Sequence, residues 1–578
     1  MLEQARAALA AGDLFAAYDC VRQANDEDRA AREYLEVLVL ARMGETAEAV
    51  RLSEAYDLGS RSDADSLSLR ARLAKDLALR EQGEKRAALL AEASDRYAEA
   101  YQRTGAYFPC INAATMAWLA GDTGRAHALA AQILADPPID EPTDYFGAAT
   151  RAEALLILGD CDAAEGALRL ALTLPGADKG SRSTTLRQLS LLAENASEGA
   201  AALLDIVRPP AVAMYAGHIF AEAPQVEALL VADIDRALDE QDIGIGYGAL
   251  AAGADILIAE RLLARGAALH VVLPFAERDF IAQSVRPAGD GWVQRFQHCR
   301  DRAASLTAAT RVGFMGDDAQ YAFGSTVAMG LARLRAEHLG ARSMQLAIWD
   351  GRGAERAGTA HDIHLWRSTG LPQALIGPPP LPPVTRPPAQ LCTETRVLRA
   401  MLFADFPGFS RISERTLPIF WRDLMGGVAE VLARHRDGIC SSNAWGDGIF
   451  VVFDSVETAA AAAVDIRRSL ADFDYRRLEM SAATGMRIGM HYGPVFEATD
   501  PITRAQTFYG SEVTLTARIE PVTPPGSVFV TESFAAMIAL KAIDGIDCAY
   551  MGRVTLPKRA GILRLYSLDA APAPLVSG

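Results

Sequence analysis

A proline-rich segment divides this chain and limits what it can fold into. Residues 377–388 read Gly-Pro-Pro-Pro-Leu-Pro-Pro-Val-Thr-Arg-Pro-Pro, with seven prolines in twelve positions. Proline lacks a backbone N–H and fixes φ, so neither a helix interior nor a central strand accommodates such a run. The segment favours an extended polyproline II conformation. We therefore predict a spacer between two domains over residues 377–392. A ligand for a proline-recognising domain is the alternative.

The overall composition is that of a multidomain globular protein. The chain has 578 residues, which is more than one hydrophobic core supports. Half of the residues are hydrophobic and 22% are charged, and no apolar run reaches the roughly 20 residues needed to span a bilayer. The first residues do not have the pattern of a signal peptide. We therefore expect a cytoplasmic protein that does not enter a membrane.

Charge and cysteine content exclude further classes of function. The formal net charge is −16, whereas DNA or RNA binding requires a clustered basic face, so no nucleic-acid partner is expected. The seven cysteines are scattered and include no Cys-x-x-Cys pair, which argues against a disulfide framework or a zinc site.

Residues 1–205 predict an all-α domain of repeated helical hairpins. The segment is rich in Ala and Leu, and a glycine followed by an acidic residue recurs between apolar stretches, at Gly12, Gly44, Gly121 and Gly159. Glycine suits the left-handed turn between antiparallel helices. The spacing is close to the repeat of about 34 residues in tetratricopeptide proteins, which the segment resembles. Two interpretations stand: a surface that binds a protein partner or oligomerises, and a helical scaffold without a separate ligand.

Residues 206–376 predict an α/β domain with a Rossmann-like parallel sheet. Short apolar segments that end in glycine, such as 211–217 and 346–351, alternate with helical segments such as 224–241. Together they resemble the SLOG superfamily of Rossmann-like nucleotide-sensing domains. The resemblance implies a nucleotide ligand near the strand ends. The candidate contact residues are Gly217, His218, Gly253, Asp255, Glu260, Gly358 and Thr359.

Each of these candidates also has a purely structural interpretation. The glycines suit tight packing between strand and helix, and Asp255 suits a helix cap. Small residues at a helix start equally let a phosphate approach the backbone N–H groups. The sequence does not place carboxylates here as a nucleotide-cleaving enzyme would require, so we assign no catalysis to this domain.

Residues 393–572 predict an α+β domain. The order is strand, helix, hairpin, helix and strand, at residues 397–404, 411–434, 438–453, 456–470 and 486–491. This βαββαβ order is that of a ferredoxin-like antiparallel sheet with its helices on one face. Fold alone does not establish function, which depends on the residues at the strand ends.

Two aspartates occupy such strand ends. Phe-Ala-Asp405-Phe-Pro-Gly-Phe-Ser follows the first predicted strand, and Trp-Gly-Asp447-Gly is the tip of the predicted hairpin. In this order and topology the motifs resemble the metal-binding motifs of class III nucleotidyl cyclases. The resemblance implies that Asp405, Asp447 and the carbonyl of Phe406 hold two Mg²⁺ or Mn²⁺ ions. It also implies that backbone N–H groups bind the triphosphate, at Phe406, Gly408, Phe409 and Ser410.

A third segment extends the resemblance. Gly510-Ser-Glu-Val-Thr514-Leu-Thr-Ala-Arg518 is similar to a family helix that reads Gly-x-x-Val-Asn-x-Ala-x-Arg. Arg518 matches the arginine that stabilises charge on the transferred phosphate. Thr514 stands where the family has the asparagine that orients the ribose, and Lys558 or the neighbouring arginine is the candidate for the terminal phosphates. In the family this helix comes from the second subunit, so a homodimer is implied.

The base-selecting positions depart from the family. Asn443 stands where adenylyl cyclases carry lysine, and Thr507 where many carry aspartate. Each side chain donates or accepts a hydrogen bond, unlike lysine, which only donates. We predict a cyclase that uses a nucleoside triphosphate, with ATP first and GTP or a pyrimidine triphosphate open. The alternative is a catalytically silent signalling protein in which the cyclase fold binds a nucleotide.

Overall fold

The chain forms two compact units. The computed structural model describes residues 1–193, 200–352, 357–385, 394–480, 484–558 and 560–571. One unit, the helical unit, consists of residues 1–209 with 338–341, and the other contains 210–337 and 342–571. We call residues 210–376 the middle domain and residues 394–571 the C-terminal domain. Across the described residues, no helix combines the length and apolar character required to cross a membrane.

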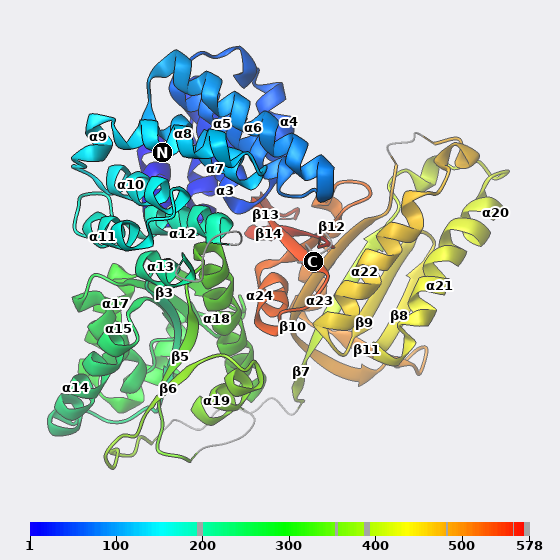
Figure 1. Cartoon of the computed structure of the whole chain (residues 1–578). Coiled ribbons are helices and arrows are strands. Elements are labelled where there is room, and N and C mark those ends of the chain that lie inside the picture. Colours follow the sequence, from blue (N-terminus) through cyan, green and yellow to red (C-terminus); the bar gives the residue numbers. More distant parts are fainter. Residues whose placement is uncertain (194–199, 353–356, 386–393, 481–483, 559, 572–578) are drawn as a thin grey trace. The chain divides into compact units, whose positions relative to one another are not determined.

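The helical unit is built from short α-helices joined by tight turns (Figure 1). Its helices are α1 (Leu2–Ala10), α2 (Leu14–Arg22), α3 (Arg29–Met43), α4 (Thr46–Ala55), α5 (Ala64–Ala78), α6 (Gly83–Thr104), α7 (Tyr107–Leu119), α8 (Thr123–Leu134), α9 (Pro137–Asp140), α10 (Tyr145–Ile157), α11 (Cys161–Ala171), α12 (Lys179–Ala193) and α13 (Ala200–Val207). Buried alanines and leucines from α7 to α13 form its largest core, so the predicted all-α N-terminus is confirmed.

The recurring glycine and acidic pair explains the turns. The four predicted glycines have positive φ, namely 70° at Gly12, 89° at Gly44, 88° at Gly121 and 85° at Gly159. The aspartate after three of them caps the next helix. The carboxylate of Asp13 accepts the N–H of Ala16 at 3.0 Å, and Asp122 and Asp160 do the same in their helices. One residue thus reverses the chain and the next begins a helix.

The middle domain contains a six-stranded parallel sheet with strand order β4-β3-β2-β1-β5-β6. Its strands are β1 (Ala211–Gly217), β2 (Ile243–Gly248), β3 (Ala268–Leu273), β4 (Ser305–Ala308), β5 (Ser343–Ile348) and β6 (Gln373–Ile376). The inner strands are almost wholly buried because helices cover both faces.

The helices of the middle domain divide between the two faces of the sheet. Figure 1 shows α14 (Pro224–Glu240), α15 (Ala254–Ala264) and α17 (Asp290–Arg302) on one side, and α18 (Asp318–Leu339) and α19 (Thr359–Ser368) on the other. The short α16 (Glu277–Phe280) follows β3. The predicted parallel layer is therefore present.

The proline-rich segment differs in part from a free spacer. Residues 377–385 contain neither helix nor strand, as expected, and 386–393 lie outside the described residues. Leu381 and Val384 pack against the core of the middle domain. The carbonyl of Pro382 also accepts the N–H of Ala221 at 3.3 Å. The first half of the run therefore lies along the middle domain.

The C-terminal domain is organised around a mixed sheet with strand order β13-β14-β12-β10-β7-β9-β8, and β11 pairs with β10. The strands are β7 (Arg396–Asp405), β8 (Ile439–Trp445), β9 (Gly448–Phe453), β10 (Arg487–Thr499), β11 (Gln506–Tyr509), β12 (Val528–Thr531), β13 (Ile546–Thr555) and β14 (Ile562–Ala570). The helices are α20 (Leu417–Ile419), α21 (Gly426–Arg434), α22 (Val456–Ala471), α23 (Ser511–Thr516) and α24 (Glu532–Lys541).

Two expectations for the C-terminal domain need correction. The sheet is not wholly antiparallel, because β12 runs parallel to β10. The helix expected over 411–434 begins only at Leu417 and contains a π-helical turn at Phe420–Met425. Proline at 418 is accommodated in the first turn of a helix but not further inside, which accounts for the late start.

Candidate active site

Asp405 and Asp447 lie together at one edge of the C-terminal sheet. β7 ends at Asp405, and its antiparallel neighbour β9 starts at Gly448, with Ala404 opposite Ile449. The hairpin tip before β9 carries Asp447. Burial raises the pKa of the Asp447 carboxyl, and the nearby Asp405 charge raises it further. The two predicted carboxylates therefore interact across the strand ends.

Two residues that the sequence analysis missed complete this charged cluster. Arg487 lies opposite Asp405 on β10, and its guanidinium donates to Oδ2 of Asp405 at 2.7 Å. The same guanidinium forms an ion pair with Oε1 of Glu520, also at 2.7 Å. Burial raises the pKa of Glu520 to about 7, Arg487 opposes this, and the charges of Asp405 and Asp447 add to it. An arginine within an otherwise apolar strand was the signal available in the sequence.

The chemistry of the cluster fits a divalent cation. Carboxylate oxygens are the ligands that Mg²⁺ prefers, and here carboxylates are close enough to raise one another's pKa. In the part of the chain that the structure describes, no three or more His, Cys, Asp or Glu side chains are arranged to hold a metal ion. The fit therefore depends on Asp405 and Asp447 together with backbone and substrate oxygens.

The turn after β7 is fixed by aromatic packing. Phe406 is buried, and its ring lies 5.4 Å from that of Phe420. Gly408 has φ 92°, which favours glycine, and the ring of Phe409 lies against the hairpin tip, where a Cβ added to Gly446 would be 3.8 Å away. The two motifs are therefore neighbours in space, as predicted.

The N–H groups of this turn are partly used within it. Phe409 donates to the carbonyl of Phe406 at 3.1 Å, and Arg411 donates to that of Gly408 at 2.9 Å. Outside helices and strands, the described residues include no hydrogen bond from the backbone N–H of Gly408 or Ser410. These two are the predicted phosphate donors that the turn leaves accessible.

The base-selecting candidates lie on adjacent strands. Asn443 is exposed on β8, and Thr507 lies on β11. The Ser441 hydroxyl donates to the carbonyl of Gln506 at 3.0 Å, which joins the two strands. The structure thus brings together two regions 64 positions apart in the chain.

Thr514 lies on the helix expected to carry it, whereas Arg518 lies just beyond that helix. α23 ends at Thr516, so Arg518 lies in the turn after the helix, where the following Pro521 disfavours a longer helix. Its guanidinium donates to the carbonyl of Lys558 at 3.3 Å, so these two candidates adjoin. Thr514 is exposed. Within the described residues, no contact joins Arg518 or Thr514 to Asp405 or Asp447.

α23 is anchored by a buried pair. Oε2 of Glu512 lies 2.9 Å from Nε2 of His491 on β10, and both residues are buried. The other ring nitrogen of His491 lies 2.9 Å from the Thr531 hydroxyl. Because such a pair is costly to break once buried, it fixes the helix that carries Thr514.

The comparisons with known proteins agree with this geometry. Residues 396–569 match the family model for the adenylate and guanylate cyclase catalytic domain. The C-terminal domain is therefore similar to cyclase catalytic domains. Residues 13–117 match the model named Tetratricopeptide Repeats-Sensor. No curated protein sequence matches the chain.

Several solved cyclase structures are similar to the C-terminal domain. The guanylate cyclase domain of RhGC from Catenaria anguillulae, in complex with GTP, is 19% identical, covering 31% of this chain and 99% of that one, with a TM-score of 0.27. The guanylyl cyclase Cya2 is 22% identical over 32% and 97%, with a TM-score of 0.27. The adenylyl cyclase CyaB from P. aeruginosa is 17% identical over 31% and 97%, with a TM-score of 0.27.

Neither family model extends over the middle domain, so its resemblance to the SLOG superfamily stays a prediction. Gly217 and Gly253 pack closely there: added Cβ atoms would lie 2.3 Å from the Ala254 Cβ and 2.6 Å from the Phe220 ring. Glu260 is engaged by Arg295 at 2.6 Å. These contacts indicate that Gly217, Gly253 and Glu260 serve the packing of the domain and do not contact a ligand.

The other middle-domain candidates are more open. Nε2 of His218 lies 2.9 Å from Oδ1 of Asp350, at the ends of the neighbouring strands β1 and β5. Gly358 has φ 88° and space around it, and Thr359 begins α19. Asp255 is not the cap of α15. It is the second residue of that helix and is buried.

Proposed function

We propose that the cyclase domain converts a nucleoside triphosphate, ATP first, into a 3′,5′-cyclic nucleotide and pyrophosphate. The observation that carries the proposal is the pairing of Asp405 and Asp447 at adjacent strand ends within the segment that matches the family model. Two Mg²⁺ or Mn²⁺ ions held there would supply Lewis-acid activation of the ribose hydroxyl and charge neutralisation of the triphosphate.

The residues of this chain would divide the remaining tasks. The N–H groups of Gly408 and Ser410 bind phosphate oxygens. The 3′-oxygen forms its bond to the α-phosphorus while the bond from that phosphorus to the bridging oxygen breaks. Pyrophosphate leaves, and the hydroxyl proton passes to solvent. Arg518 stabilises the negative charge that grows on the phosphate, and Thr514 orients the ribose.

Recognition of the remaining parts of the substrate completes the proposal. Asn443 and Thr507 bind the base from adjacent strands, and Lys558 binds the terminal phosphates. Because Arg518 and Thr514 show no contact with the aspartates in the described chain, we infer a homodimer in which each subunit supplies half of a site. This is the arrangement that the family resemblance implies.

The test is direct. The purified full-length chain is incubated with ATP, GTP, CTP or UTP and Mn²⁺, and the products are identified by mass spectrometry. A cyclic nucleotide from at least one triphosphate is expected. Nucleotide binding without any product would instead support the catalytically silent protein. The ion pair between Arg487 and Asp405 favours this second candidate, because the guanidinium of Arg487 already neutralises one of the two carboxylates.

A further inference from the structure

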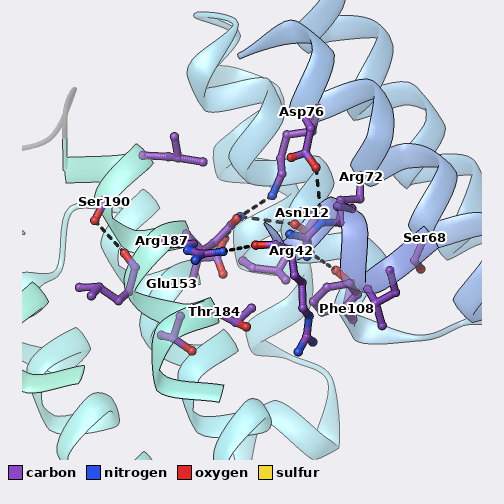
Figure 2. A pocket seen from close by; sticks show the side chains of 18 of the residues that line it. Arg42, Ser68, Arg72, Asp76, Phe108, Asn112, Glu153, Thr184, Arg187 and Ser190 are labelled. Atoms are coloured by element: carbon purple, nitrogen blue, oxygen red, sulfur yellow. Dashed lines mark hydrogen bonds and ion pairs between the residues drawn. The ribbon is translucent and has the colours of Figure 1, made fainter. Parts of the chain in front are cut away.

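A cavity of about 920 Å³ lies within the helical unit and is lined by basic side chains (Figure 2). Its walls come from α3, α4, α5, α6, α7, α10, α12 and α13. This volume is in the range of sites for small molecules and cofactors. Neither the proposed cyclase chemistry nor the helical packing requires such a space. Its charged lining residues are Arg42, Asp65, Arg72, Lys75, Asp76, Arg80, Glu153, Arg187 and Arg208.

The basic residues of this cavity are only partly balanced by acids. Arg72 pairs with Asp76 at 3.5 Å, and Arg208 pairs with Asp205 at 2.9 Å. In the described part of the chain, no carboxylate forms an ion pair with Arg42 or Arg187. Arg187 donates instead to the carbonyl of Arg42 at 2.8 Å and to that of His338. A chain with net charge −16 thus leaves two guanidinium groups here without an acidic partner.

The buried carboxyl of Glu153 does not offset this charge. Glu153 accepts hydrogen bonds from the Thr115 hydroxyl at 2.5 Å and from Gln188 at 2.8 Å. Burial raises its pKa, which favours the neutral form. Lys75 donates to the same Gln188 at 3.2 Å, so the lysine has an amide rather than a carboxylate as its partner.

The resulting concentration of positive charge is costly without a ligand. Burial lowers the pKa of Arg42 to about 10, and the charges of Arg72 and Arg187 lower it further. Burial also lowers the pKa of Arg187, followed by the charge of Arg72. Arginine does not lose its proton at neutral pH. The guanidinium groups therefore stay charged and repel one another, which destabilises the cavity when no ligand is bound. An anion with two or more charges would relieve this repulsion.

The rest of the lining selects a planar ring. Phe108 and Phe146 are 44% and 37% exposed, and both line the cavity with Tyr97. Aromatic faces stack with bases. Asn112 adds an amide that donates and accepts, and Figure 2 shows it within the same cluster as Arg42 and Arg187.

We propose that this cavity binds a nucleotide carrying at least two phosphates, with Arg42 and Arg187 on the phosphates and the exposed phenylalanines on the base. The site is separate from the cyclase site. The helical unit therefore has a small-molecule ligand of its own, in addition to any protein partner.

The experiment is calorimetric titration of the full-length chain with ADP in EDTA, so that metal-dependent binding to the cyclase domain is minimised. The double variant Arg42→Gln/Arg187→Gln should weaken ADP binding at least about tenfold, corresponding to about 1.4 kcal/mol. The matched control Arg51→Gln alters an exposed arginine on α4 and should bind within about twofold of the wild type. Arg518→Ala should also leave this binding unchanged.

A second readout separates binding from folding. Without ADP, the double variant should melt at or above the temperature of the control, because it loses like-charge repulsion. If the double variant does not fold, Arg42→Lys should weaken ADP binding at unchanged melting temperature, since it keeps the charge but not the forked geometry.

Four results overturn the proposal. They are absence of ADP binding in the wild type, equal ADP binding in the folded double variant, equal ADP binding in Arg42→Lys where the double variant does not fold, or loss of ADP binding in Arg518→Ala. Binding of a hexaglutamate peptide without ADP binding would also overturn it, because the cavity would then recognise acidic protein segments. None of these readouts depends on cyclase turnover.

Discussion

The proposed cyclase site and the cavity of the helical unit both concentrate charge, but the charge is of opposite sign and is compensated differently. At the cyclase site, one residue of the chain, Arg487, contacts both Asp405 and Glu520. In the cavity, Arg42 and Arg187 have no acidic partner among the described residues. The acidic cluster is thus partly neutralised by an arginine of the chain, whereas Arg42 and Arg187 are not paired with an acid in the described residues.

This difference indicates what a ligand must do at each site. A cation that binds Asp405 competes with the Arg487 guanidinium, so binding rearranges an existing ion pair. An anion that enters the cavity displaces no acid and only removes repulsion. Ligand binding at the first site therefore requires an ion pair to rearrange, whereas ligand binding at the second site requires no such rearrangement.

The largest expected effect comes from removing one carboxylate of the cyclase site. Asp447→Ala should lower turnover by about 10³-fold, corresponding to about 4 kcal/mol, because it removes half of the proposed metal site. The matched control is Asp437→Ala, which removes an exposed carboxylate just before β8. Product formation is measured by mass spectrometry. Turnover of Asp447→Ala within about twofold of that control would remove the basis of the metal assignment.

The next prediction concerns how the site is divided between subunits. Asp405→Ala and Arg518→Ala are each expected to be inactive, but an equal mixture that exchanges subunits should recover about a quarter of wild-type activity. Half of the dimers are then mixed, and each contains one intact site of two.

The control for this experiment is a mixture of Asp405→Ala and Asp447→Ala. Both changes affect the same half of the site, so no dimer contains an intact one and no recovery is expected. Lack of recovery in the first mixture, when exchange is demonstrated with differently labelled subunits, would show that one subunit forms the whole site.

The sequence predicted the fold better than the site, because the signals for helices, strands and turns lie within short stretches of the chain. Alternating apolar segments and the Gly-Asp turns are encoded within a few neighbouring residues, so the helical and parallel β elements were identified. The interrupted helix before Gly426 was missed because its late start depends on Pro418 and on tertiary packing. A resemblance to family motifs supplied Asp405 and Asp447, which the structure brings together.

The missed charges are not local. Arg487 and Glu520 join Asp405 through strand pairing and a turn after α23, and no sequence spacing links them. The cavity is lined by residues from eight helices, so nothing in the sequence indicates that its arginines lie together. Interactions between distant segments therefore account for most of what sequence reasoning did not find.

A smaller effect is expected for base selection. Adenine and guanine present opposite donor and acceptor patterns, and Asn443 with Thr507 can satisfy either. The preference for ATP over GTP should therefore be less than about 100-fold, or roughly 3 kcal/mol. Asn443→Lys with Thr507→Asp should increase it. Ser442→Lys is the control, because it adds the same charge on the opposite face of β8.

Values of kcat/KM for ATP and GTP in the three proteins test this prediction. A wild type that already discriminates several thousandfold would show that other residues read the base. An equal shift in the control would show that added charge alone, and not its position on the strand, changes the preference.

The smallest effect concerns a third cluster, in the middle domain, where charge is reduced by protonation instead of by a partner. Asp255 and Asp362 are both buried, and each has one carboxyl oxygen with no hydrogen bond among the described residues. Burial raises the pKa of each to about 7, and the Asp255 charge adds to the increase at Asp362. The folded state therefore binds protons more tightly than the unfolded state.

The sign of the pH dependence follows from this cluster. The stability that the protonated carboxyls contribute to the folded state is fully present below about pH 4, which is near their pKa in the unfolded chain. This stability is lost as the pH rises through about 7, the pKa in the folded state. At pH 8, Asp362→Asn should raise the free energy of unfolding by on the order of 1 kcal/mol, since the buried amide brings unpaired groups of its own. At pH 5 the gain should disappear.

Asp242→Asn is the control, because that residue is exposed and its φ of 49° suits asparagine. Urea unfolding at both pH values measures the difference, and a gain of equal size at pH 5 would show that packing, not charge, is responsible.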